Sequence, residues 1–210
     1  QDTAAANQSW SHTCTGSDRI LFVMASGSIT NDITAVTYDG VAMTEIASID
    51  AGSGIRDMSL WYLINPATGG AKTVQTTTTS GTAKGQSVSY TGAKQSAQPD
   101  ASTTDSELNV TSNTVTLTTI ANNCWTIIYG SAGTGDIGVG AGTTSRAEFA
   151  NNSENAGDSN AVISPAGSTS LIVTSSGSAA DRTLAGIMAS IAPAAATAVN
   201  IPTLLTLGVG

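Results

Sequence analysis

Turn residues divide this chain into short runs of strand-forming residues, at a spacing of about 8–12 residues. The sharpest case is the segment Ala35 to Ile46, in which Asp39-Gly40 separates AVTY from VAMTEI. A tight hairpin needs positive φ at both of its turn positions, and Asp and Gly tolerate that conformation. The segment therefore predicts a two-residue hairpin, and turn signals repeated at this spacing are typical of an antiparallel sandwich.

Further strands are predicted on both sides of this hairpin. Met58 to Ile64 is the most hydrophobic run, and Asn65-Pro66 ends it because proline cannot donate to a ladder. The other predicted strands cover residues 19–25, 72–79, 86–91, 115–120, 125–129, 143–149, 161–164, 171–174 and 184–191. Residues 92–108 and the glycine-dense run 133–142 are expected to be loops. The sequence thus predicts an all-β fold, a two-sheet antiparallel β-sandwich that is jelly-roll-like, with about a dozen strands in one domain over residues 1–193.

Composition excludes several classes of function. Charged residues make up only 10% of the chain, and Leu, Glu, Lys and Arg are too scarce for long helices. The net charge is −8, so the chain lacks the basic surface that a nucleic-acid partner requires. No apolar run reaches the roughly 18 residues of a membrane-spanning helix. We therefore expect no nucleic-acid partner and no membrane span.

The chain begins at Gln1 rather than Met, which fits removal of a signal peptide or trimming of the chain. We expect an extracellular or cell-surface location. In that setting Cys14 and Cys124 could form a disulfide that closes a long loop, and two buried free thiols are the alternative. Glycosylation acceptor patterns begin at Asn7, Asn109 and Asn151, although such matches arise readily in a chain rich in Ser and Thr.

Residue types that carry catalysis or bind metals are few. His12 is the one histidine, and we expect it to make a structural hydrogen bond rather than act as a base. One histidine and two distant cysteines are too few for zinc, and no acidic loop reproduces a calcium-binding pattern, although a structural calcium stays open. No spacing singles out a pair of carboxylates for glycoside hydrolysis. We predict no enzyme activity, no cofactor and no metal site.

The C-terminal segment differs in composition from the rest of the chain. A small-residue linker, Ala194 to Ala198, follows Pro193 and leads into the apolar segment Val199 to Val209. Such a segment could add to the edge of a sheet in a neighbouring subunit. The residues predicted to take part in assembly are Val199, Ile201, Leu204, Leu205, Leu207 and Val209. The polar N-terminal arm, residues 1–9, is a second candidate connector.

Four segments carry a resemblance to a known group of proteins. A jelly-roll-like β-sandwich domain family is similar to WSHTCTGSDRILFVMAS at residues 10–26, VTYDGVAMT at residues 36–44, LWYLINPATGGAKTV at residues 60–74 and SVSYTGA at residues 87–93. That family is found in secreted, surface and phage-associated proteins. The resemblance covers residues 10–93 best, and it implies a repeated or self-assembling extracellular module without a catalytic signature.

These observations favour a structural role. The leading hypothesis is a subunit of an extracellular filament or surface assembly, in which a helical polymer of identical subunits is joined by β-strand addition of a terminal segment. A virion decoration or tail protein is one alternative. Another is a carbohydrate-binding jelly-roll module, which would present exposed aromatic side chains such as Trp10, Trp61 and Trp125 on one sheet.

Overall fold

The computed structural model describes residues 7–27, 33–50, 57–79, 82–133, 135–148, 154–177 and 183–195, and these form strands and turns without a helix. The first eight strands are β1 (Ser9–His12), β2 (Ile20–Gly27), β3 (Ile33–Tyr38), β4 (Val41–Ala42), β5 (Thr44–Ile49), β6 (Met58–Ile64), β7 (Lys72–Thr78) and β8 (Ala83–Tyr90). The second eight are β9 (Ala101–Leu108), β10 (Ser112–Thr118), β11 (Trp125–Ala132), β12 (Ile137–Val139), β13 (Thr143–Glu148), β14 (Glu154–Ser159), β15 (Ser168–Ser175) and β16 (Thr183–Ile191).

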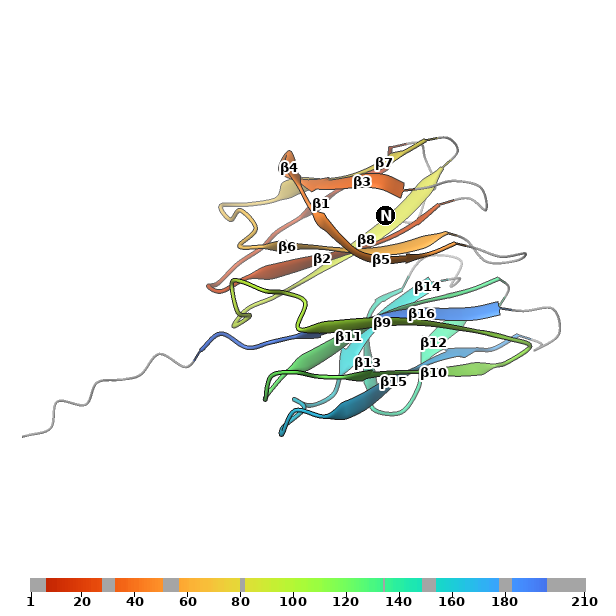
Figure 1. The fold of residues 1–210 in the computed structure, drawn as a ribbon. Helices are drawn as coiled ribbons and strands as arrows, with labels where there is room; N and C mark the ends of the chain where they lie inside the picture. The colour runs from red at the N-terminus through yellow and green to blue at the C-terminus, as the bar shows by residue number, and fades with distance from the viewer. Residues whose placement is uncertain are drawn as a thin grey trace, which may run out of the picture.

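The strands form four antiparallel sheets that stack as four layers (Figure 1). The first sandwich consists of the sheet β1-β7-β3-β4 and the sheet β5-β6-β2-β8. The second sandwich consists of the sheet β13-β14-β11-β16-β9 and the sheet β10-β15-β12. The predicted all-β antiparallel class is confirmed. The described residues form two sandwiches, four sheets and sixteen strands, where the sequence predicted one sandwich, two sheets and about a dozen strands.

The Asp39-Gly40 hairpin forms as predicted. Both residues have positive φ, 52° and 77°, and Tyr38 pairs with Val41 across the turn. The second strand of this hairpin is short, because the chain leaves the sheet after Ala42 and begins β5 in the facing sheet at Thr44. The turn therefore carries the chain from one layer of the first sandwich to the other.

Three strands lie where the sequence indicated loops or gave no strand signal. β9 lies within the predicted loop 92–108, β12 lies within the glycine-dense run, and β14 has the sequence ENAGDS. In turn, the predicted strand 161–164 is wrong: that segment makes only one isolated bridge, between Ile163 and Cys124. β9 and β14 were missed because polar residues can fill strands whose pairing and burial are set by neighbouring strands rather than by their own side chains.

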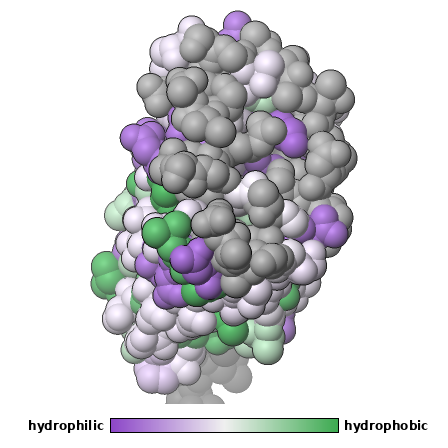
Figure 2. Space-filling view, turned by 90° about the vertical axis from the view of Figure 1, so that its right-hand side faces the viewer, coloured by the Kyte–Doolittle hydropathy of each residue, from purple (hydrophilic) through white to green (hydrophobic). Residues whose placement is uncertain are grey.

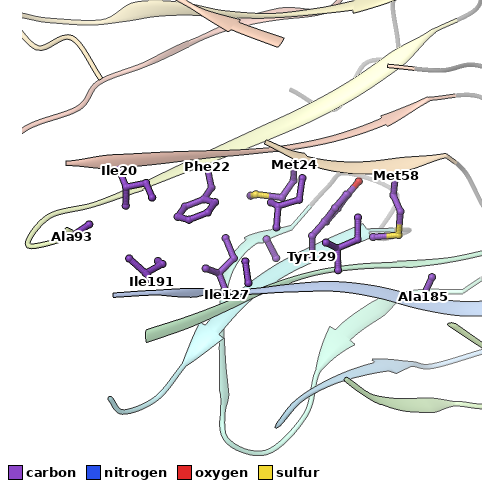
Figure 3. Close-up of a cluster of buried hydrophobic side chains, with 13 residues drawn as sticks. Ile20, Phe22, Met24, Met58, Ala93, Ile127, Tyr129, Ala185 and Ile191 are labelled. Atoms are coloured by element: carbon purple, nitrogen blue, oxygen red, sulfur yellow. The ribbon is translucent and has the colours of Figure 1, made fainter. Parts of the chain in front are cut away.

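Hydrophobic side chains gather in three layers between the four sheets. Alternation along β2 explains this arrangement, because successive side chains of a strand point to opposite faces. Leu21, Val23 and Ala25 point into the first sandwich, whereas Ile20, Phe22 and Met24 point toward the second sandwich. β11 does the same, with Ile127 and Tyr129 in the shared layer (Figure 3). We call the shared layer the central core and the other two the first and second outer cores.

Polar side chains also join the two sandwiches across the central core. The Tyr90 hydroxyl of β8 donates to Asp158 Oδ2 of β14 at 2.9 Å, and Arg146 Nε donates to the same oxygen at 2.7 Å. Ser26 of β2 donates to Glu154 Oε1 at 2.8 Å, and Glu154 is fully buried. Because the acceptor carboxylates of Asp158 and Glu154 are buried, these bonds fix how the sandwiches lie on each other.

The two sandwiches repeat one topology. The order β5-β6-β2-β8 corresponds to β13-β14-β11-β16, and the order β1-β7-β3 corresponds to β10-β15-β12. Two close contacts support this equivalence. A Cβ atom on Gly85 of β8 would meet the ring of Trp10 on β1, and a Cβ atom on Gly186 of β16 would meet Val115 on β10. The chain therefore forms the same sandwich twice, and the two copies face each other through equivalent sheets.

Candidate functional site

The two sandwiches differ most clearly at one edge. In the second sandwich β9 lies beyond β16 and pairs with it antiparallel over eight residues, from Thr183 opposite Leu108 to Ser190 opposite Ala101. In the first sandwich β8 is the counterpart of β16, and no described strand lies beyond it. Strands at the edge of a sheet are templates for pairing with another chain. The outer edge of β8, which we call the β8 edge, is therefore the candidate site.

A polar cluster lies beside the β8 edge, in the first outer core. His12 of β1 bonds through Nδ1 to the hydroxyl of Ser87 at 3.0 Å and through Nε2 to the hydroxyl of Ser89 at 3.0 Å. Trp10 Nε1 donates to Ser87 Oγ at 2.9 Å. All four residues are half-buried. The prediction that His12 makes a structural hydrogen bond is confirmed, and we call this group the His12 cluster.

The second sandwich has apolar residues at three of the four corresponding positions. The fourth is Ser190, which corresponds to Ser89 and donates its hydroxyl to Asp100 Oδ2 at 3.2 Å. Counting outward from the equivalent glycines, Trp10 and His12 correspond to Val115 and Leu117, and Ser87 corresponds to Met188. The three apolar side chains are buried in the second outer core. The His12 cluster therefore lies where the other sandwich has a mainly apolar layer.

Burial affects the ionisation of His12. Its partly desolvated ring has a pKa below the usual value, because burial disfavours the charged imidazolium. The ring stacks edge-on to Tyr38, with ring centroids 6.4 Å apart. The Tyr38 hydroxyl donates to the backbone oxygens of His12 and Ala67. Neutral His12 thus belongs to a hydrogen-bonded network that fixes β1 against the rest of the first sandwich.

The predicted disulfide between Cys14 and Cys124 is wrong. Both cysteines are free and buried, and each belongs to a different sandwich. Cys14 packs in the first outer core, whereas the thiol of Cys124 donates to the backbone oxygen of Ala121 at 3.1 Å and approaches Asp100 Oδ2 at 3.5 Å. The alternative of two buried thiols is therefore the observed one.

The other predicted residues are placed as follows. Asn7 and Asn109 are exposed, at the start of β1 and in the turn after β9, so both acceptor patterns lie at the surface. Asn151 lies outside the described residues. The six residues predicted to take part in assembly also lie outside the described residues: Val199, Ile201, Leu204, Leu205, Leu207 and Val209. Their role stays a prediction.

The three tryptophans do not line one exposed face. Trp61 is buried, while Trp10 and Trp125 are half-buried against the first outer core and the central core. Large exposed hydrophobic residues come from separate turns and strand ends. In Figure 2 the coloured hydrophobic residues are likewise scattered among paler ones. Within the described ranges, no row of exposed aromatic rings is available to stack on a sugar.

One acidic cleft lies where β5 ends and β6 begins. It has a volume of about 300 Å³, and Glu45, Asp50 and Asp57 are among its lining residues. Over the part of the chain that the structure describes, no group of three or more His, Cys, Asp or Glu side chains could hold a metal ion. The same residues contain no helix of the length and hydrophobicity needed to cross a membrane. The β8 edge with its His12 cluster is thus the feature that most clearly separates the two sandwiches.

No protein family, curated protein or solved structure that was compared with this chain matches it.

Proposed function

We propose that this chain is a structural subunit of an extracellular filament or surface assembly whose copies join by β-strand addition. The observation that carries the proposal is the β8 edge. The same topology occurs twice in one chain, and one copy has a fifth strand at the position where the described part of the other copy has none. An added strand gains backbone hydrogen bonds along its whole length, and side-chain pockets provide its specificity.

The rest of the surface supports a structural role. Charged residues are few, and hydrophobic residues on the surface are scattered. Each sandwich is closed by its own outer core, and the shared central core makes one rigid block of four layers (Figure 1). A rigid block that accepts a strand at one place and donates a strand from another makes head-to-tail contacts. Such contacts produce an open polymer when the rotation between copies does not close a ring.

The test of this proposal is electron microscopy of the purified full chain over a range of concentrations. The expected result is regular filaments or sheets whose repeat matches one subunit. A matched sample carries Ser87→Pro, because proline in an added ladder disrupts pairing at the β8 edge. Assemblies should be lost or shortened in that sample, while its circular dichroism should stay β-type. Dispersed single particles of the unmodified chain at every concentration would contradict the proposal.

A further inference from the structure

The two sheets that enclose the central core differ in width. The sheet of the second sandwich has five strands and ends in β9, whereas the sheet of the first sandwich has four strands and ends in β5. Figure 1 shows β5 above β9 where the two sandwiches meet. Within the described ranges, no strand lies beyond β5 to cover the face that β9 turns toward the first sandwich. We call this face of β9 the shelf.

The side chains of the shelf are exposed. Thr104 lies opposite Ile187 of β16, which is buried in the central core. Ser106 lies opposite Ala185, which is buried in the same core. Residues opposite each other share one face, so Thr104 and Ser106 lie on the central-core side of β9, yet both are exposed. Leu108 lies on the same side and is 68% exposed. The sheet face that packs against the first sandwich is therefore uncovered along β9.

A hollow lies between β5 and the shelf. It has a volume of about 300 Å³, and it is lined by Ser48 and Ile49 of β5 and by Thr104, Asp105 and Ser106 of β9. Ile49 is half-buried against the central core, whereas the lining on the β9 side is polar. The hollow thus follows the line along which a fifth strand of the first sandwich would lie over β9.

The acidic cleft adjoins the same strand edge, because Ser48 and Ile49 line both hollows. Its acidic lining residues are Glu45, Asp50 and Asp57, and the first two are exposed. No Lys or Arg is among the described residues that line the cleft or the hollow over the shelf. Since charges of opposite sign attract each other at short range even in water, these two hollows favour a cationic ligand.

The outer backbone edge of Thr44–Ile49, which we call the β5 edge, can accept a further strand. Every backbone hydrogen bond that the structure describes for these residues belongs to the ladder with β6. Glu45 lies opposite Trp61 of the first outer core, so it is on the side of the sheet away from the shelf. Successive side chains of a strand point to opposite faces. A strand added at the β5 edge would therefore turn one set of side chains toward Glu45 and the other set toward the shelf.

From this arrangement we infer that the β5 edge binds an extended, basic polypeptide segment by strand addition. Basic side chains of the segment point toward the acidic cleft, and the alternate, small side chains cover the shelf. The segment brings the sheet of the first sandwich to five strands, which matches the sheet that faces it. The β5 edge and the β8 edge are opposite edges of one sheet, so this inference goes beyond the proposed assembly and does not rest on it.

The first experiment measures the fluorescence anisotropy of a dye-labelled peptide of four Lys-Thr repeats, with blocked ends, as the full chain is added. We expect saturable binding that weakens as the salt concentration rises. A peptide of four Glu-Thr repeats is the control for charge and should bind at least about tenfold more weakly. No saturable binding of the Lys-Thr peptide, or equal binding of the two peptides, would overturn the inference.

Variants of the full chain locate the site. Glu45→Gln combined with Asp50→Asn removes two exposed charges from the acidic cleft and should weaken binding of the Lys-Thr peptide about three- to tenfold. The control combines Asp18→Asn with Asp136→Asn, which removes two exposed charges outside both hollows. Its affinity should stay within about twofold of the unmodified chain. Equal weakening in the two double variants would show that the peptide responds to net charge alone, and would remove the site from the β5 edge.

Methylation of the peptide backbone tests strand addition itself. Successive residues of an extended strand direct their N–H groups to opposite edges, so only the Lys residues or only the Thr residues can donate to the β5 edge. One version of the Lys-Thr peptide carries N-methyl groups on its Lys residues, and the other carries them on its Thr residues. One version should bind about as tightly as the unmethylated peptide, and the other at least about tenfold more weakly. Similar binding of both versions would contradict pairing with β5.

Discussion

The first and second sandwiches have the same strand order, but among the described strands only the second has a fifth strand at this edge. β9 lies beyond β16, and beneath it Val115, Leu117 and Met188 form an apolar layer. At the β8 edge, the equivalent layer contains Trp10, His12 and two serines that are half-buried and hydrogen-bonded. The comparison teaches that one strand order can carry either an apolar layer or a polar layer joined by hydrogen bonds.

The largest expected effect is a slow reaction of the cysteine thiols, one of which is buried in each sandwich. Burial, followed by the neighbouring Asp100 carboxylate, raises the pKa of Cys124 to about 11. Only the thiolate reacts, so in a Cys14→Ala variant at pH 8 Cys124 should label about 10²-fold more slowly in the folded chain than in urea. A thiol-reactive dye with absorbance detection measures both rates. Protein of the original sequence, denatured without reductant, should yield two free thiols per chain. A yield of no free thiol would instead show that Cys14 and Cys124 form a disulfide.

Shortening a side chain in the apolar layer of the second sandwich should lower the free energy of unfolding more than shortening one in the His12 cluster. Leu117→Ala removes a buried side chain from the second outer core and should lower the free energy of unfolding by about 2–5 kcal/mol. His12→Ala removes half-exposed hydrogen bonds at the equivalent position and should cost about 1 kcal/mol. Urea unfolding followed by circular dichroism gives both values. Thr116→Ala, which shortens an exposed side chain of the same strand as Leu117, serves as the control. Equal losses of unfolding free energy in Leu117→Ala and His12→Ala would contradict a difference in packing between the two layers.

The equivalent glycines Gly85 and Gly186 test how tightly the first and second outer cores are packed. Gly186→Ala forces a methyl group against buried Val115 and should destabilise the chain by about 1–3 kcal/mol. Gly85→Ala meets the ring of Trp10 instead, which is half-buried and can turn toward solvent. That variant should lose less stability but shift tryptophan emission to longer wavelength. The reverse order of stabilities would mean that the first outer core is as tightly packed as the second.

The smallest effect is a pH dependence from His12, the one histidine of the chain. Its pKa is lowered by burial, so between its folded pKa and the ordinary value of about 6.5 the unfolded chain binds more protons. Stability should therefore fall as the pH is lowered from about 7 through this window, and then level off with respect to this group. Urea unfolding of the original chain and of His12→Gln, compared at each pH, isolates the effect. A difference between them that does not change with pH would contradict a desolvated ring.

Much of the fold could be predicted from sequence because alternation and turn chemistry are local. The Asp39-Gly40 hairpin and the hydrophobic strand at Met58 to Ile64 are examples. β9 could not be predicted, because ASTTDSEL carries no apolar alternation and is held by its register with β16. The repeat was also hidden, since Trp10 corresponds to Val115, and Ile20 of β2 occupies the position of Trp125 in β11.

The candidate site was predictable only on its donor side. The apolar C-terminal segment is visible in the sequence, and its role stays a prediction. The acceptor appears only when the two sandwiches are compared, because an edge is a property of strand order rather than of residue type. Two glycines at equivalent positions, Gly85 and Gly186, are the nearest signal that the sequence offers.

Hydrogen exchange of the full chain, measured by mass spectrometry before and after assembly, tests the central claim most directly. In dilute, dispersed copies, amides in Ser87 to Tyr90 of β8 should exchange faster than those in the equivalent part of β16, which β9 covers. On assembly the β8 amides should become as protected as those of β16. Full protection of β8 in dispersed copies, or unchanged exchange in assembled ones, would contradict the account.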